Sequence, residues 1–177
     1  MRFAPAFGVF VALAMTVKAA PAAAGPVDVS AAYQYLHVSS GGDGESLPAG
    51  FALGIRVPTM NGFGVIGDFG WNTKTDSGVK AQPMTFGAGI RYIPMADRMS
   101  AVHPYLQAVA GAERLKVSLG SVSSSETKFM IQPGVGASFP MGMWSSFIEA
   151  NYRHVSSDPS ANDLALRAGV ILTFGSK

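Results

Sequence analysis

Strict alternation of residue type is the feature that most constrains how this chain can fold. From Leu164 to Phe174 every second residue is apolar, while the residues between them include Arg167, Gly169 and Thr173. Successive side chains of a β-strand point to opposite faces, so a period of two predicts a strand with one apolar and one mixed face. Such a strand needs either lipid or a packed interior against its apolar face.

Similar runs occur along the whole chain and predict eight strands. Polar loops rich in Gly and Ser follow the odd-numbered strands at Ser39–Ser46, Thr73–Gly78 and Ser118–Thr127. Compact turns led by proline follow the even-numbered strands, because proline has no N–H for the ladder. Transmembrane β-barrels show the same asymmetry, with longer outer loops and short periplasmic turns. The predicted strands are Val27–Val38, Gly50–Val57, Phe63–Asn72, Met84–Tyr92, Pro104–Val117, Phe129–Phe139, Phe147–His154 and Leu164–Phe174.

The composition favours a membrane barrel. Hydrophobic residues make up 48% of the chain, charged residues only 14%, and cysteine is absent, which excludes disulfides and zinc–thiolate sites. Beyond the N-terminal region the chain lacks the roughly 18 consecutive apolar residues of a spanning helix, whereas tilted strands of about 9–11 residues can cross a bilayer. We therefore expect an all-β fold, an eight-stranded antiparallel up-and-down transmembrane β-barrel.

The first 24 residues have the pattern of a cleaved signal peptide. Arg2 supplies a positive start, Phe7–Val17 is apolar, and Ala22-Ala23-Ala24 offers a small-residue cleavage site. This pattern predicts residues 1–24 as the signal and 25–177 as the barrel domain. A retained N-terminal anchor is the alternative.

Strand-borne charges lie opposite the apolar faces and are expected inside the barrel. An eight-stranded interior is just wide enough for side chains, and the Gly and Ser residues on this face leave room for large ones. Because buried charges must be paired, a balance of acids and bases predicts a closed ionic network. A soluble barrel with its charges facing water is the alternative. The predicted interior charges are Asp28, Arg56, Asp68, Arg91, Glu113, Glu149, Arg153 and Arg167.

The strand at Pro104–Val117 is the least regular of the eight. If Leu106 and the alanines that follow it face outward, then Tyr105 and Val109 fall on the interior face. Aromatic residues near the strand ends fit the interfacial belts of membrane proteins. The predicted interfacial aromatics are Trp71, Tyr92, Trp144 and Tyr152.

Three stretches resemble the small eight-stranded outer-membrane barrels of the OmpA/OmpX and opacity type: Pro104-Tyr105-Leu106, Glu149-Ala150-Asn151-Tyr152-Arg153, and the final strand from Arg167 to Phe174. The resemblance implies an outer-membrane location and a monomer in contact with lipid and lipopolysaccharide. It also implies insertion by the barrel-assembly machinery, with Phe174 as the assembly signal, although Gly175-Ser176-Lys177 follows it here. The implied role is envelope integrity, adhesion or host contact, without catalysis.

One motif offers an enzymatic alternative. Lipid A 3-O-deacylases are similar barrels with His-x-Ser late in the penultimate strand, and this chain has His154-Val155-Ser156. The spacing places both side chains on one strand face, where the imidazole can act as base to the hydroxyl. The family motif continues with Asn, which is Ser157 here, and an inward carboxylate expected on the last strand is missing. Asp163 is the only candidate to orient the His.

Other chemistries find little support in the sequence. His37, His103 and His154 are not at metal-ligand spacing, so no metal or cofactor is expected. Loss of Arg2 and Lys18 with the signal lowers the basic residues from 13 to 11, which equals the 11 acidic residues, and no basic stripe indicates nucleic acid. A narrow pore is the remaining alternative, although eight strands usually enclose a filled interior.

Overall fold

The computed structural model describes residues 26–40, 43–94, 100–156 and 161–175. These residues form β-strands and turns, and none of their segments is a helix long and apolar enough to cross a membrane. The strands are β1 (Val27–Ser40), β2 (Asp43–Leu47), β3 (Ala49–Pro58), β4 (Phe63–Asp76), β5 (Val79–Tyr92), β6 (His103–Leu119), β7 (Val122–Met141), β8 (Trp144–Val155) and β9 (Ala161–Phe174).

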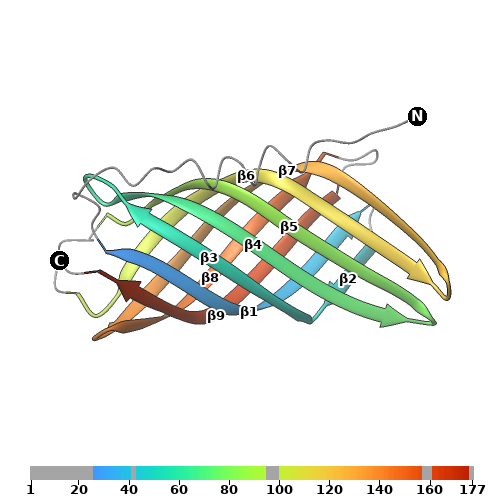
Figure 1. Cartoon of the computed structure of the whole chain (residues 1–177), viewed down its shortest axis with the longest axis horizontal. Coiled ribbons are helices and arrows are strands. Elements are labelled where there is room, and N and C mark those ends of the chain that lie inside the picture. The colour runs from blue at the N-terminus through green and yellow to red at the C-terminus, as the bar shows by residue number, and fades with distance from the viewer. Residues whose placement is uncertain (1–25, 41–42, 95–99, 157–160, 176–177) are drawn as a thin grey trace.

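The strands form a closed antiparallel barrel (Figure 1). Each strand from β3 to β9 pairs with its neighbour in the sequence, and β9 returns to pair with β1 from Val27↔Phe174 to Ser40↔Ala161. Only Pro48 separates β2 from β3, and both pair with β1, so together they serve as one strand of an eight-stranded barrel. We call the end where β1 begins and β9 stops the terminal end, and the opposite end the distal end.

A bulge at Pro48 joins β2 to β3. Leu36 pairs with Leu47, but Tyr33 pairs with Phe51, so the second strand contains one more residue than β1 requires. A bulge of this kind reverses which residues face inward. As a result Leu47 and Ala52, at positions of opposite parity, are both buried, with exposed fractions of 3% and 3%.

The polar loops expected at the distal end are mostly paired strands instead. β4 and β5 continue to a turn at Ser77-Gly78, and β6 and β7 continue to a turn at Gly120-Ser121. Ser77, Gly78 and Gly120 have positive φ angles of 48°, 83° and 56°, as tight hairpin turns require. The predictions of loops at Thr73–Gly78 and Ser118–Thr127 were therefore wrong, because alternating polar residues can pair as a solvated ribbon.

The predicted loop at Ser39–Ser46 was wrong for the same reason, since β1 and β2 pair through most of it. The ribbons of β4–β5 and β6–β7 extend beyond the rest of the barrel at the distal end (Figure 1). β6 has 17 residues and β7 has 20, about twice the 9–11 residues needed to cross a bilayer.

The apolar faces point outward, as the alternation predicted. On β6, Leu106 is 59% exposed while its neighbour Tyr105 is 2% exposed, so the irregular strand does place Tyr105 and Val109 inside. Interior glycines make room for large side chains. A Cβ at Gly136 would lie 2.4 Å from Tyr105 Cζ, so only glycine fits beside this ring.

Besides a buried apolar cluster of Ala32, Ala52, Phe147 and Ile171 toward the terminal end, two apolar clusters lie further along the barrel. Leu36, Leu47 and Ala165 form one buried cluster, and Val109, Met130 and Val155 belong to a second one with Ile66. Along the inward faces of β1, β8 and β9 these apolar residues alternate with polar and charged ones, so apolar and charged layers share the distal half of the interior.

Candidate functional site

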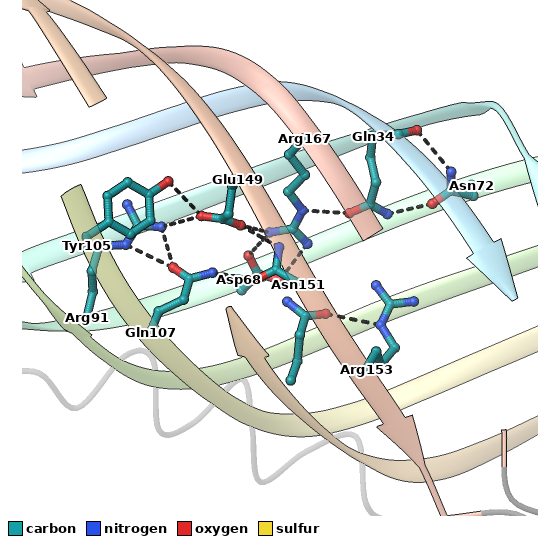
Figure 2. A network of polar contacts seen from close by, with 11 residues as sticks. Gln34, Asp68, Asn72, Arg91, Tyr105, Gln107, Glu149, Asn151, Arg153 and Arg167 are labelled. Carbon is teal, nitrogen blue, oxygen red and sulfur yellow. Dashed lines mark hydrogen bonds and ion pairs between the residues drawn. The ribbon is translucent and has the colours of Figure 1, made fainter. Parts of the chain in front are cut away.

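Glu149 of β8 is the centre of a polar network inside the barrel (Figure 2). Its Oε2 accepts hydrogen bonds from Arg91 Nη2 at 3.0 Å and Tyr105 Oη at 2.9 Å. Its Oε1 accepts from Asn151 Nδ2 at 2.7 Å and Arg167 Nη1 at 3.2 Å. The Arg91 guanidinium also lies 4.2 Å from the centre of the Tyr105 ring. One carboxylate thus joins residues from four strands, β5, β6, β8 and β9.

Arg167 of β9 extends the network across the barrel. It donates to both carboxylate oxygens of Asp68 on β4, at 2.6 and 3.0 Å. Its Nε donates to Gln34 Oε1 on β1 at 2.7 Å, and Gln34 Nε2 in turn donates to Asn72. Figure 2 shows this chain of contacts crossing the interior. The two arginines and two acids at the centre balance in charge, so burial leaves no uncompensated ion.

A second cluster surrounds Arg153 nearer the distal end. Arg153 Nη1 lies 3.0 Å from Glu113 and 3.7 Å from Asp163, and Arg153 Nε donates to Gln132 at 3.1 Å. Burial is nearly complete, with 1% of the Arg153 side chain and 2% of the Asp163 side chain exposed. A third pair, Arg56 and Asp28 at 2.9 Å, lies near the terminal end.

The structure therefore places all eight predicted charges in the interior and gives each an oppositely charged partner. Asp163 was not among the predicted interior charges, and the neutral side chains that connect the network were not predicted either. Continuing the alternation of β9 past Leu164 would have placed Asp163 inward. The missed neutral members are Gln34, Asn72, Tyr105, Gln107, Gln132 and Asn151.

Little free space remains among these side chains. A cavity of about 20 Å³ lies between the Asp28–Arg56 pair and the central cluster, which is on the order of the space that one water molecule needs. A wider funnel of about 930 Å³ opens at the terminal end, lined by residues such as Thr59, His103 and Ser145. Between the described strands the charged centre is packed, and the funnel opens at the terminal end.

The outer surface of β8 and β9 carries the His-x-Ser motif. His154 is exposed, and its Nδ1 lies 2.9 Å from Asn162 Oδ1 on β9, which also accepts a hydrogen bond from Tyr152 at 2.8 Å. The prediction that Asp163 could orient His154 was wrong. Asp163 faces the interior toward Arg153 because adjacent residues of a strand alternate in direction, so Asn162 occupies the outward position.

The remaining motif residues are less closely joined. Ser156 is exposed beyond the end of β8, and its backbone N–H donates to Phe129 O at 2.9 Å. Among the described residues, no hydrogen bond joins the side chains of Ser156 and His154. Ser157 lies outside the described residues. The arrangement therefore supplies an oriented imidazole without an engaged nucleophile.

The other predicted site residues lie near the strand ends except Trp71, which lies within β4 because this strand continues to Asp76. Trp71 and Tyr152 are toward the distal end, with Trp71 against Phe51 at 5.5 Å between ring centres, while Tyr92 and Trp144 are toward the terminal end. Phe174 ends β9 opposite Val27. In the described part of the chain no group of His, Asp and Glu side chains is suited to hold a metal ion.

Comparison with known proteins identifies the architecture. The family model described as "Outer membrane protein beta-barrel domain" matches residues 7–174, while the sequence matches no curated protein. Neisserial surface protein A (NspA) is similar in structure, with a TM-score of 0.73 and 20% identity over 84% of this chain and 97% of that one.

Two further solved structures share the fold. Ail, the attachment invasion locus protein of Yersinia pestis, has a TM-score of 0.58 and 24% identity in its complex with the heparin analogue sucrose octasulfate, covering 84% of this chain and 99% of that one. OprG from Pseudomonas aeruginosa has a TM-score of 0.56 and 9% identity, covering 86% and 97% of the two chains. These likenesses concern the fold.

Proposed function

This chain belongs to the outer-membrane β-barrel protein family, and from that premise we propose that it is a monomeric surface-interaction protein of the outer membrane. Its extended β4–β7 hairpins project from the cell and contact a partner, in adhesion, host contact or support of the envelope. Residues 1–24 act as an export signal, both ends of the barrel domain face the periplasm, and the distal end faces the exterior.

The observation that carries this proposal is an apolar surface on the inward side of the distal extension. Val79, Leu115, Val117, Leu119 and Val122 are 39%, 39%, 37%, 59% and 72% exposed, and by strand parity they face the same side as buried Val109 and Met130. Soluble surfaces rarely gather large apolar residues without a partner. Outside the membrane such a surface favours contact with a protein that has an apolar patch.

An adhesion assay tests this role. Cells expressing the Leu119→Ser/Val122→Ser variant should adhere several-fold less to host cells or matrix-coated plates than cells with the wild type, because burial of these side chains drives the contact. Ser118→Ala/Ser123→Ala is the matched control, since it changes the other face of the same hairpin tip. Equal adhesion by all three strains, at equal surface levels, would refute the apolar contact.

Membrane insertion has its own test. The barrel should be extracted from the outer membrane only with detergent and should change its gel migration on boiling, because a closed barrel stays folded in detergent until heated. We also propose that the barrel-assembly machinery recognises the last strand through Phe174, so Phe174→Ala should lower the folded fraction in cells. Recovery of the protein from the soluble periplasm without detergent, with a gel migration that boiling does not change, would refute insertion.

A lipid A 3-O-deacylase remains the second candidate, favoured by the contact between His154 and Asn162. An amide oxygen that accepts the Nδ1 proton would leave Nε2 free to act as a base. Mass spectrometry of lipid A from cells with the wild type, His154→Ala or Ser156→Ala decides the matter. Lipid A identical to that of a vector control in all strains would end the enzymatic interpretation.

A further inference from the structure

The funnel at the terminal end has two arginines at its inner end. Arg56 of β3 and Arg91 of β5 line both the funnel and the adjoining cavity of about 20 Å³. Both are mostly buried, with 10% of the Arg56 side chain and 12% of the Arg91 side chain exposed. The two arginines therefore lie where the open funnel meets the packed centre of the barrel, and we call them the floor of the funnel.

Gly64 of β4 lets the two guanidinium groups approach each other. It pairs across the sheet with Arg91, and a Cβ at Gly64 would lie 2.6 Å from Arg56 Nε. The Arg56 side chain thus lies over the strand that separates β3 from β5, in the space that a larger residue would fill. Two cations lie on the same side of the funnel floor, and such an arrangement attracts an anion.

Each arginine keeps a nitrogen that has no protein partner. Arg56 donates from Nη1 to Asp28 at 2.9 Å, whereas its Nε and Nη2 form no hydrogen bond with a described residue, and Nε is buried. Arg91 donates from Nε and Nη2 to Gln107 and Glu149, which leaves Nη1 without a described partner. Because a buried donor without an acceptor destabilises the fold, these nitrogens favour an acceptor that a ligand supplies.

The acids near the floor already have partners. Asp28 accepts from Arg56 with one carboxylate oxygen and from Thr173 Oγ1 with the other, the latter at 2.8 Å. Glu149 accepts four hydrogen bonds and lines the small cavity instead of the funnel. Among the described residues, the Asp, Glu, Lys and Arg side chains of the funnel wall are two arginines and one aspartate. The wall therefore has an excess of positive charge.

Hydroxyl groups line the funnel around this floor. They belong to Thr59, Ser138, Ser145 and Thr173, and a hydroxyl can both donate and accept a hydrogen bond. The funnel volume of about 930 Å³ lies within the usual range for ligand sites, about 300–1,000 Å³. A sugar-sized solute with one oxyanion group suits this arrangement, with the oxyanion at the floor and the hydroxylated part against the wall.

We propose that the funnel binds a small hydroxylated solute through an oxyanion, carboxylate or phosphate, that lies between Arg56 and Arg91. A guanidinium pairs with either group through charge-assisted hydrogen bonds. The proposed orientation places the terminal end in the periplasm, so the ligand is a periplasmic solute. Only the compartment of the ligand rests on that orientation, because binding to the purified protein is independent of it.

Nuclear magnetic resonance on the ¹⁵N-labelled protein, folded in detergent micelles, tests the site with both ends accessible. Glucose 6-phosphate and gluconate are the probes, and saturable shifts are expected for the amide signals of Gly64, Arg91 and Ser145 but not for Ser124 near the distal tip. The probe that binds more tightly identifies phosphate or carboxylate as the oxyanion. Uncharged glucose should bind roughly tenfold more weakly. Equal shifts with glucose, or no saturable shift with either anion, would overturn the proposal.

Asp28→Asn/Arg56→Gln removes an ion pair without changing the net charge of the protein. It should weaken binding roughly tenfold or more, because the oxyanion loses a charge-assisted hydrogen bond. Glu45→Gln/Lys74→Gln is the matched control, since it removes an ion pair of 3.0 Å toward the distal end, and it should change the affinity less than about twofold. Equal losses in the two variants would contradict a site at the funnel floor.

Ser145 offers a test that leaves both arginines in place. Ser145→Lys should tighten binding and Ser145→Glu should weaken it, each roughly twofold to fourfold, because a charge in the funnel wall acts on the bound anion through water. The same effect from both substitutions would refute an anionic ligand. Heat-modified gel migration verifies folding of each variant. A barrel that folds and inserts but binds neither anion would refute the ligand site alone, whereas failure to insert would refute the proposed membrane role.

Discussion

At the scale of single residues, Glu149 shows how a narrow barrel tolerates charge. Its two oxygens accept four hydrogen bonds, from Arg91, Tyr105, Asn151 and Arg167. Burial removes water from each of these charges, and the attraction of an oppositely charged partner offsets that loss of hydration. Removal of one partner therefore leaves a buried charge that nothing compensates. Buried arginines on different strands thus depend on one carboxylate.

Glu149→Gln is expected to destabilise the barrel by about 3–5 kcal/mol, because Arg91 loses its carboxylate partner and Arg167 loses one of two. Urea titration monitored by gel migration measures the change. Glu126→Gln serves as control, since that carboxylate is 69% exposed and an exposed pair contributes only about 0–1 kcal/mol. Equal midpoints for the two variants would contradict the central role of Glu149.

At the scale of strands, the same alternation serves two environments. Ile148 in the middle of β8 is 56% exposed and Leu119 at the tip of β6 is 59% exposed, yet only Ile148 lies between the aromatic residues Trp144 and Tyr152 of its strand. We expect lipid around Ile148 and water around Leu119. The exposed fraction of a side chain does not distinguish the two environments. The folding free energy lost when a charged side chain is introduced does distinguish them.

Ile148→Arg should cost about 2–4 kcal/mol of folding free energy, the usual cost of an arginine facing lipid at the bilayer midplane. Leu119→Arg should change it by no more than about 0.5 kcal/mol, as most surface substitutions do. Equilibrium refolding into phospholipid vesicles measures both values. Similar costs at the two positions would contradict this assignment, because Ile148 and Leu119 would then both face lipid or both face water.

At the scale of the whole molecule, packed side chains fill the interior between the funnel and the distal end. The funnel at the terminal end leads to the charged centre, and beyond it the apolar clusters around Leu36 and Met130 lie beside the ion pairs of Arg153. An ion crossing this path would have to displace packed apolar side chains as well as ion pairs.

Planar bilayers containing the wild-type protein should therefore show no stepwise conductance. Conductance steps that change in size with Arg91→Ala or Arg167→Ala would establish the pore interpretation instead. A protein lacking the barrel, added in the same detergent, controls for leakage caused by the detergent.

The alternation of residues in the sequence determined the number of barrel strands, the outward direction of their apolar faces and the eight charges inside. This information is local, because a strand exposes alternate side chains to opposite faces whatever its neighbours are. The lengths of the strands were not determined by such local information. Polar residues such as Thr75 and Ser124 are compatible with loops, and only pairing with another strand decided that they extend the sheet.

The partners of each side chain were decided by the tertiary structure alone. Arg167 meets Asp68 although 99 residues separate them, because barrel closure and strand register bring β9 and β4 to opposite walls of a narrow interior. Register likewise placed Asn162 beside His154 and turned Asp163 toward Arg153. Register and closure are properties of the whole sheet, so the sequence pattern specified which face each charge occupies but not which charge it meets.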